Sequence, residues 1–397
     1  MVLRPWVAAV VAGCLALLAL SLAARSLQTG LGPGLGDAWA QPAVSRGGLV
    51  FVSAIYGSER PEHDGPSEIA WQTGDVLERM RSVLEATGSS LGQLASVNVY
   101  LGRAADFAAM NEAYATFFPE APPTRTTVVS DLPPGALVAM SGVAVPNGAR
   151  REVLHPSGWV KSPRPYSYIV RTEHLVFLSG LVSRRGVDDQ LVPGTINTQA
   201  RTILDNARVL LRTAGLAFRD VVAAKVFIAD ELYYVDMNDA YRRIFTSAPP
   251  ARATAVTPLM TEEAKVEMTF IASTGGREVL GPTVAPSVPL SAAVAAGPFV
   301  FLSGVLGNTD ANVSDPRAQM REALTRIGRT LETAGVTYSD VVENVVYVRE
   351  SAQLAEIESV YREFFSSNPP ARTTIAARLV SSTGLVEVMT VAVKEGN

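Results

Sequence analysis

The 397-residue sequence predicts an α+β protein made of three tandem domains, each with two helices on one face of a mixed sheet. A short motif occurs three times, as PPTRTT, PPARAT and PPARTT, with its arginine at Arg125, Arg252 and Arg372. Strand-like and helix-like segments follow one another in the same order around each copy. A period of about 120 residues is too long for a solenoid and fits tandem domains.

Each repeat opens with an apolar, strand-like run that ends in a serine. These runs are Leu49–Ser53, Leu175–Ser179 and Phe299–Ser303, and their serines lie 126 and 124 residues apart. Such short runs of β-branched and aromatic residues are typical of buried strands. The motif arginines are spaced by 127 and 120 residues, so both markers give a period of about 120 residues.

An amphipathic helix follows each opening run. In the third repeat Asp315 is the expected N-cap, Pro316 occupies the first helical position and Gly335 closes the helix. A second strand-like run, a second helix, the Pro-Pro-x-Arg motif and a last pair of strands complete the unit. The second runs are Val97–Leu101, Val221–Ile228 and Val341–Val348.

The two helices of a unit cover one face of its sheet and leave the other face to be buried elsewhere. Three such sheets in one chain can pack against each other, so we expect a closed barrel with pseudo-threefold symmetry. The chain then acts as a monomer that is a covalently linked trimer. We divide it into an N-terminal segment, residues 1–40, and three domains at residues 41–150, 151–280 and 281–397.

Composition excludes several classes of function. The net charge is −4 and no Lys/Arg cluster follows the N-terminus, which argues against a nucleic-acid partner. Cys14 is the only cysteine, and the three histidines lack metal-site or triad spacing. Phosphate loops and dinucleotide fingerprints are also absent from the sequence, so we expect no metal and no organic cofactor.

The N-terminal segment has the features of an export signal. Residues 5–24 are almost entirely apolar and follow Arg4, and Ala38-Trp39-Ala40 precedes Gln41 as an A-x-A cleavage site. The apolar run is also long enough to span a bilayer, so an uncleaved membrane anchor is the alternative. In both cases we expect the body of the protein outside the cytoplasm.

Four sequence features, which recur in the same order along the three repeats with some departures, resemble the RidA/YjgF family of enamine/imine deaminases, also known as L-PSP endoribonucleases. They are the F-[VL]-S-G run, the N-x-x-Y helix before an aromatic pair, the PPAR-[TA]-T motif and a final V-E-[VM] strand. The resemblance covers nearly all of residues 41–397. It implies chorismate-mutase-like domains and small-molecule sites in the clefts between them.

In the family, the motif arginine holds a substrate carboxylate, and a glutamate, a tyrosine, a serine and an asparagine complete the site. The second repeat matches every position, with Tyr166, Ser179, Asn238, Arg252 and Glu267. The third repeat matches with Ser303, Arg372 and Glu387, but has Leu290 for the tyrosine and Glu358 for the asparagine. The first repeat keeps Ser53, Asn111 and Arg125, and has Ala54 after the serine and Ala139 for the glutamate.

Each of these residues also has a structural interpretation. A serine inside a strand can satisfy backbone groups, and the buried glutamates Glu267 and Glu387 can pair with the arginine fifteen residues earlier. For Arg125, whose own repeat lacks the glutamate, we prefer the structural role. The sequence does not show which repeats meet at each cleft, so the set of the second repeat can also be divided between two clefts.

The resemblance predicts an exported deaminase that hydrolyses small 2-imino or enamine carboxylic acids to a 2-oxo acid and ammonia. An arginine can orient the carboxylate and a partly buried glutamate can move a proton, so the expected partner is a small carboxylate-bearing molecule. The alternative is a protein of the same fold that binds a small carboxylate without catalysis, or a scaffold. A ribonuclease activity is opposed by the acidic charge.

Overall fold

The computed structural model describes residues 39–60, 65–285 and 288–394. The apolar run at residues 5–24, which we interpret as a signal or anchor, lies outside the described residues. Within those ranges, no helix is both long enough and apolar enough to cross a membrane.

The first unit is a five-stranded sheet with strand order β1-β2-β5-β3-β4. Its elements are β1 (Ala43–Arg46), β2 (Leu49–Tyr56), α2 (Glu68–Ala86), β3 (Leu94–Leu101), α3 (Phe107–Phe117), β4 (Thr124–Val129) and β5 (Val138–Ala144). Strands β3 and β4 are parallel and the other pairs are antiparallel, so the sheet is mixed. Strand β4 begins directly after the Pro-Pro pair, and the motif arginine Arg125 is its second residue.

The second unit repeats this plan. Its elements are β6 (Glu152–Leu154), β7 (Ile169–Arg171), β8 (Leu175–Leu178), α4 (Ile196–Thr213), β9 (Val221–Ile228), α5 (Tyr234–Arg242), β10 (Ala251–Val256) and β11 (Val266–Ser273). The strand order of its sheet is β17-β10-β9-β11-β8-β7-β6, in which β17 is a short strand of the third unit. Because β17 pairs with β10, backbone hydrogen bonds join the second and third units.

The third unit has strand order β12-β13-β14-β18-β15-β16. Its elements are β12 (Glu278–Ala285), β13 (Val288–Ala296), β14 (Phe299–Leu306), α6 (Pro316–Thr333), β15 (Val341–Val348), α7 (Leu354–Phe364), β16 (Ala371–Ala376), β17 (Arg378–Leu379) and β18 (Val386–Val393). Asp315 caps α6 by accepting a hydrogen bond from the Ala318 amide at 2.9 Å, and Pro316 is the first helical residue. Both positions confirm the sequence prediction.

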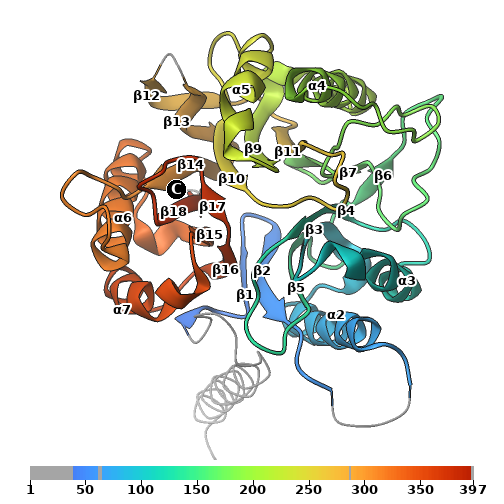
Figure 1. Ribbon diagram of the computed structural model, residues 1–397, viewed down its shortest axis with the longest axis horizontal. Coiled ribbons are helices and arrows are strands. Elements are labelled where there is room, and N and C mark those ends of the chain that lie inside the picture. The colour runs from blue at the N-terminus through green and yellow to red at the C-terminus, as the bar shows by residue number, and fades with distance from the viewer. Residues whose placement is uncertain (1–38, 61–64, 286–287, 395–397) are drawn as a thin grey trace, which may run out of the picture.

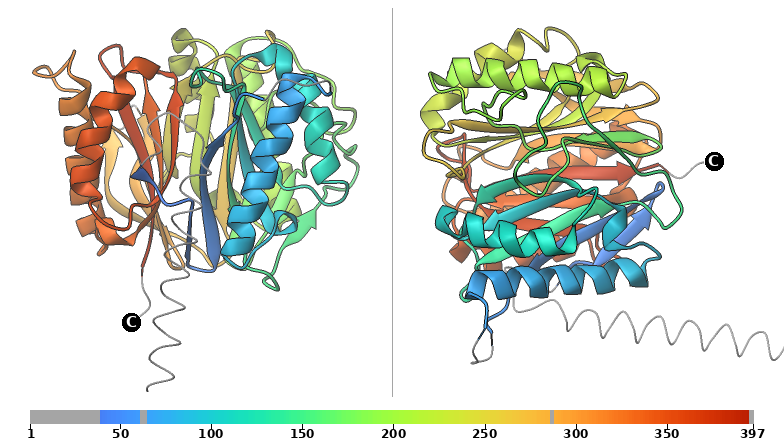
Figure 2. Two further views of the ribbon diagram at one scale, coloured as in Figure 1. Left: turned by 90° about the horizontal axis from the view of Figure 1, so that it is seen from below. Right: turned by 90° about the vertical axis from the view of Figure 1, so that its right-hand side faces the viewer.

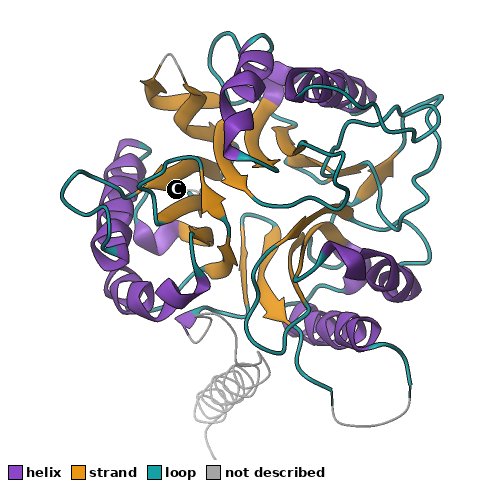
Figure 3. Cartoon of the chain, in the orientation of Figure 1, coloured by secondary structure: helices purple, strands orange, loops and turns teal. Residues whose placement is uncertain are grey.

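The three units surround a common axis, with the sheets inside and the helices outside (Figures 1 and 3). In side view the strands of all three sheets line the interior and the long helices lie on the periphery (Figure 2). Each unit has its own apolar core between sheet and helices. A fourth core contains residues of all three sheets, including Phe51, Phe177 and Phe301. The predicted α+β pseudo-trimer is confirmed, because the faces that the helices leave uncovered pack against each other.

A cavity of about 40 Å³ lies where the inner faces of the three sheets meet, and it contains an unusual pair of charges. Lys225 of β9 and Glu343 of β15 line it together with Asn98 of β3. Burial lowers the pKa of Lys225, and the charge of Glu343 opposes this shift. Burial also raises the pKa of Glu343, and Lys225 opposes that shift. The two charges therefore stabilise each other across the junction of the second and third units.

We expect that removing either Lys225 or Glu343 alone lowers the free energy of unfolding more than removing both. Lys225→Met and Glu343→Leu should each lower the free energy of unfolding by about 3 kcal/mol, because each leaves a buried charge without its opposite. The double variant should recover most of that loss. Denaturant unfolding of the four proteins measures these values, and losses that simply add in the double variant would contradict the coupling.

Candidate functional site

The same hydrogen-bond pair joins neighbouring units at all three junctions. The Arg125 amide donates to Ser179 Oγ at 2.9 Å, and Ser179 Oγ donates to the Ser167 carbonyl at 2.8 Å. We call this pair the serine clasp. At the other junctions the Arg252 amide donates to Ser303 Oγ at 2.8 Å, and the Arg372 amide donates to Ser53 Oγ at 2.9 Å. The serine hydroxyls thus pair with backbone amide and carbonyl groups. They also place the motif arginine of each unit in contact with the neighbouring unit.

The serine clasp corrects the grouping of site residues by repeat. Each cleft takes its arginine and helix position from one unit, and its serine, tyrosine and glutamate positions from the next. Arg252 therefore does not share a cleft with Tyr166, Ser179 and Glu267 of its own repeat. The first cleft holds Asn111, Arg125, Tyr166, Ser179 and Glu267. The second holds Arg252, Leu290, Ser303 and Glu387, with Asn238 at the corresponding position of its helix. The third holds Ser53, Glu358 and Arg372, with Ala54 and Ala139 at the positions of the glycine and the glutamate. The complete set lies around Arg125, for which the sequence favoured a structural role.

In the first cleft, two side chains of α3 hold the guanidinium group of Arg125 in place. Its Nη2 donates to Asn111 Oδ1 at 2.5 Å, and its guanidinium carbon lies 4.9 Å from the centre of the Tyr114 ring. Asn111 and Tyr114 are three residues apart on α3 and so share one helix face. Arg125 is 4% exposed and burial lowers its pKa, while its Nη1 has no hydrogen-bond partner among the described residues. A buried, unpaired guanidinium nitrogen at a pocket is suited to an anionic ligand.

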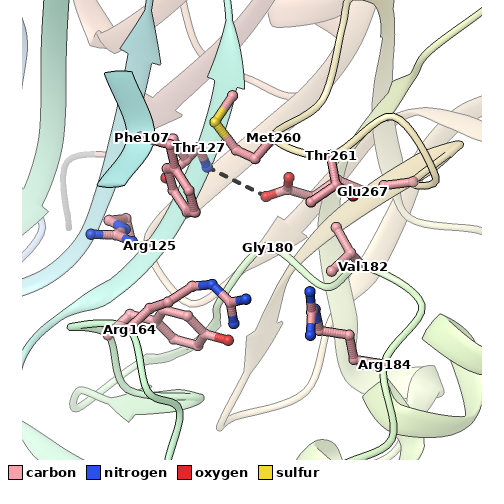
Figure 4. A pocket seen from close by; sticks show the side chains of 12 residues that line it. Phe107, Arg125, Thr127, Arg164, Gly180, Val182, Arg184, Met260, Thr261 and Glu267 are labelled. Carbon is pink, nitrogen blue, oxygen red and sulfur yellow. Dashed lines mark hydrogen bonds between the residues drawn. The ribbon is translucent and has the colours of Figure 1, made fainter. Parts of the chain in front are cut away.

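Glu267 faces Arg125 across the first cleft. Its Oε1 accepts a weak hydrogen bond, at 3.4 Å, from the Thr127 amide of β4, two residues beyond the arginine (Figure 4). Burial raises the pKa of Glu267 to about 8, although the Thr127 amide and the charge of Arg125 both act to lower it. The expected pairing of Glu267 with Arg252, fifteen residues earlier, is therefore wrong: its cationic neighbour is the arginine of the preceding unit.

The first cleft contains two further arginines that the sequence analysis did not single out. Arg164 and Arg184 line the same cavity of about 70 Å³ as Arg125 and Glu267 (Figure 4). The Tyr166 ring lies 5.9 Å from the guanidinium carbon of Arg125 and also lines the cavity. Tyr166 thus lies in one cavity with Arg125, and this cavity is more cationic than expected.

The second cleft also contains a motif arginine and a strand glutamate, but other residues line the cavity around them. Arg252 is 1% exposed and lies 4.8 Å from the Tyr241 ring, and its three guanidinium nitrogens have no hydrogen-bond partner among the described residues. Burial raises the pKa of Glu387 to about 8, against the opposing charge of Arg252. The cavity has a volume of about 400 Å³, and Leu290 stands in it where the first cleft has Tyr166.

The third cleft is closed by its own side chains. Arg372 Nη2 forms an ion pair with Glu358 Oε2 at 2.9 Å, so the helix position that holds asparagine in the other clefts supplies an internal carboxylate. The strand position of the glutamate is Ala139, which pairs with Tyr100 as Glu267 pairs with Phe227. Arg372 therefore already has an anionic partner, and alanine stands where the other clefts have their strand glutamate.

A glycine and a glutamate occur together in the two open clefts. A Cβ atom on Gly180 would overlap Glu267 Oε1, and one on Gly304 would overlap Glu387 Oε1. The carboxylate therefore needs the glycine that follows the clasp serine. In the third cleft that position is Ala54, and its glutamate position is also alanine. The alanine at the glycine position and the alanine at the glutamate position are thus physically linked, because a Cβ atom at the first takes the space that a glutamate carboxylate at the second would need.

Comparison with known proteins places this geometry in a family. The model of the endoribonuclease L-PSP family matches residues 33–146, 160–274 and 282–394. The chain is 33% identical over 124 residues to Protein DfrA of Myxococcus xanthus, which covers 31% of this chain and 95% of DfrA. It is 31% identical over 118 residues to a RutC family protein of Sulfurisphaera tokodaii, which covers 29% of this chain and 94% of the relative.

One solved structure resembles the chain over more than a single unit. A chorismatase crystal structure matches 76% of this chain and 93% of its own chain, with a TM-score of 0.51 and 15% identity, which shows the fold alone. Three matches of one family model in tandem show more. The chain belongs to the endoribonuclease L-PSP family, also called the RidA/YjgF family, and contains three of its domains.

The titration of the two buried glutamates gives a test of both clefts. A carboxyl with a pKa of about 8 in the folded state and 4.5 in the unfolded state stabilises the fold fully below pH 4.5, and this contribution is lost as the pH rises through 8. The free energy of unfolding should therefore fall between about pH 5 and pH 9. Glu267→Gln and Glu387→Gln should each flatten that fall, by up to about 1.4 kcal/mol per pH unit.

Denaturant titrations at several pH values measure this slope. Glu112→Gln, on the exposed face of α3, is the matched control and should leave the slope unchanged. Equal slopes for the wild type and both buried-site variants would show that these carboxyls titrate as ordinary surface groups.

Proposed function

We propose that the protein hydrolyses small 2-imino or enamine carboxylic acids, giving a 2-oxo acid and ammonia, at its first and second clefts. Membership of the RidA/YjgF family supports a small-molecule deaminase or binding role. The observation that carries the proposal is the pairing, in one cavity, of a buried arginine with a glutamate whose pKa is about 8. Among the described residues, this pairing is found in the first and second clefts, whereas the third has Ala139 at the glutamate position.

The arginine binds and orients the substrate. Arg125 lines the cavity, and its Nη1 has no hydrogen-bond partner among the described residues, while Asn111 and Tyr114 hold the guanidinium group in place. A carboxylate would therefore meet a prepositioned donor. Charge-assisted hydrogen bonds of this kind contribute about 1.5–3 kcal/mol. Arg125 does not transfer a proton, because a guanidinium group stays charged across the working pH range.

The glutamate moves protons. With a pKa of about 8, Glu267 is mainly protonated at neutral pH and can donate its proton to the enamine carbon or the imine nitrogen. The resulting carboxylate can accept a proton from the water that attacks the imine carbon. The C–O bond forms and gives a carbinolamine, and Glu267 returns its proton to the amine nitrogen. The C–N bond then breaks as the hydroxyl proton passes back to Glu267, nitrogen leaves as ammonia, and the former imine carbon becomes the ketone carbon of the 2-oxo acid.

Binding without catalysis is the second candidate function, and the second cleft gives it a specific basis. The three unpartnered guanidinium nitrogens of Arg252 favour a bound carboxylate whether or not chemistry follows. A carboxylate that binds to a protein with no deaminase activity would establish this alternative.

The proposal predicts loss of activity when both cleft arginines are removed. We expect the wild type to accelerate the hydrolysis of 2-imino acids formed in situ from amino acids by an amino-acid oxidase, with the 2-oxo acid measured against the buffer rate. Arg125→Ala/Arg252→Ala should lower this acceleration about 100-fold, because both carboxylate donors are lost. The rate should fall above about pH 8, where Glu267 and Glu387 lose their protons.

The third cleft provides a matched control. Arg372→Ala/Glu358→Ala removes the same motif arginine, together with its ion-pair partner, from the closed cleft and should keep the wild-type rate. Alanine retains the backbone amide of each serine clasp, and the melting temperatures report whether each variant folds. A wild type that does not exceed the buffer rate, or a control that loses activity equally, would refute the deaminase proposal.

The proposal includes export through the N-terminal segment. Supporting evidence is the apolar run at residues 5–24. Cleavage after Ala40 would, however, remove the Trp39 side chain. The Trp39 indole nitrogen donates to the Phe365 carbonyl at 2.5 Å, and the guanidinium carbon of Arg362 lies 5.2 Å from its ring.

We therefore propose an exported protein that retains Trp39, either through an uncleaved anchor or through earlier cleavage. Fractionation of the producing cells should place the protein outside the cytoplasm, and sequencing of its N-terminus should show a start at or before Trp39. A cytoplasmic location would refute export, and a start at Gln41 would refute retention of Trp39.

A further inference from the structure

The first and second clefts share their reacting groups and differ in what surrounds them. We propose that they take different classes of 2-imino acid: a short dicarboxylic acid in the first cleft, and a monocarboxylic acid with an apolar side chain in the second. This inference rests on the proposed deaminase function, because it assigns substrates to the same two sites.

The serine clasp allows the two linings to be compared position by position. Ser179 Oγ donates to the Ser167 carbonyl, and Ser303 Oγ donates to the Ser291 carbonyl in the same way. Counting from these serines, three polar positions of the first cleft change in the second. Arg164 is replaced by Val288, Tyr166 by Leu290 and Arg184 by Asn308.

The first cleft has more positive charge than one carboxylate can neutralise. Arg164 and Arg184 share a single counter-ion, Asp189, at 3.0 and 3.3 Å from its Oδ2. Arg125 adds a third positive charge, and Glu267, with a pKa of about 8, adds little negative charge at neutral pH. Among the described residues, three cations thus face one anion, Asp189. A substrate carboxylate on Arg125 leaves one positive charge uncompensated, which favours a second carboxylate on the same molecule.

The size of the first cavity limits the distance between those two carboxylates. Its volume is about 70 Å³, whereas that of the second cleft is about 400 Å³. The imine of a short acidic amino acid, such as aspartate, carries two carboxylates in little space. The first cleft therefore fits a compact dianion better than a long aliphatic or aromatic chain.

The second cleft offers one uncompensated cation and an apolar wall. Arg252 is unpaired among the described residues. The second arginine of its lining, Arg326, is already bound by Glu322 at 2.7 Å and by the Leu306 carbonyl at 2.7 Å. The apolar residues of the lining are Val288, Leu290, Ala292, Val305, Leu306 and Val380. One carboxylate neutralises Arg252, and an apolar side chain fills the remaining space.

Single variants separate the two clefts. Imines formed in situ from aspartate and from leucine serve as the two substrates. Arg125→Ala should lower the aspartate-derived rate at least about tenfold and leave the leucine-derived rate within about twofold, and Arg252→Ala should do the reverse. Arg164→Val/Tyr166→Leu, which copies the second lining into the first cleft, should reduce the preference of the first cleft for the aspartate-derived imine.

Equal losses of both activities in Arg125→Ala and Arg252→Ala would overturn the division of substrates. Calorimetric titration with two unreactive carboxylates, succinate and 4-methylpentanoate, tests the same division without chemistry. Arg125→Ala should abolish only succinate binding and Arg252→Ala only 4-methylpentanoate binding. This selective binding in an inactive wild type would refute the deaminase function and support the assignment of ligands. Binding of both compounds at one cleft would refute the assignment itself.

Discussion

The serine clasp is the interaction on which the rest of the structure depends. A single hydroxyl accepts from the amide of an arginine in one unit and donates to a carbonyl in the next, and both partners are buried. Buried backbone groups must be paired. The clasp therefore fixes the register of neighbouring sheets and, in the same step, the position of the arginine side chain. Architecture and site geometry are specified by the same atoms, which explains why the Pro-Pro-x-Arg motif and the serine occur in all three units even where the cleft is closed.

Much of the fold was accessible from sequence because its signals are local. The N-cap Asp315, the Pro316 that follows it and the Pro-Pro pair before Arg125 each act through their own backbone, so single repeats could be assigned. The composition of the clefts was not accessible in this way. Glu267 belongs with Arg125 because the units pack in a cyclic order, and no local pattern records which neighbour stands on which side. The sequence therefore identified the residue types of the site but assigned the best set to Arg252.

One signal for the correct assignment is present in the sequence. The glycine after the clasp serine and the glutamate of the last strand come from the same unit and compete for the same space, so Gly180 accompanies Glu267 and Ala54 accompanies Ala139. If each site were made of residues from one unit, a unit without the glycine and the glutamate would be expected to lose the asparagine and the arginine as well. The first unit instead keeps Asn111 and Arg125 intact. This pattern indicates that its arginine serves a cleft whose glutamate lies in another unit.

The covalent linkage of the three units has a consequence for concentration. In a homotrimer, every cleft between subunits disappears when the protein is diluted below its dissociation constant, and its apparent stability depends on concentration. Here the links between the first and second sheets and between the second and third sheets hold the partners at a high effective concentration. The clefts of this chain thus persist at any dilution. A substitution also enters the assembly once instead of three times, so each cleft can change its lining while the other two keep theirs.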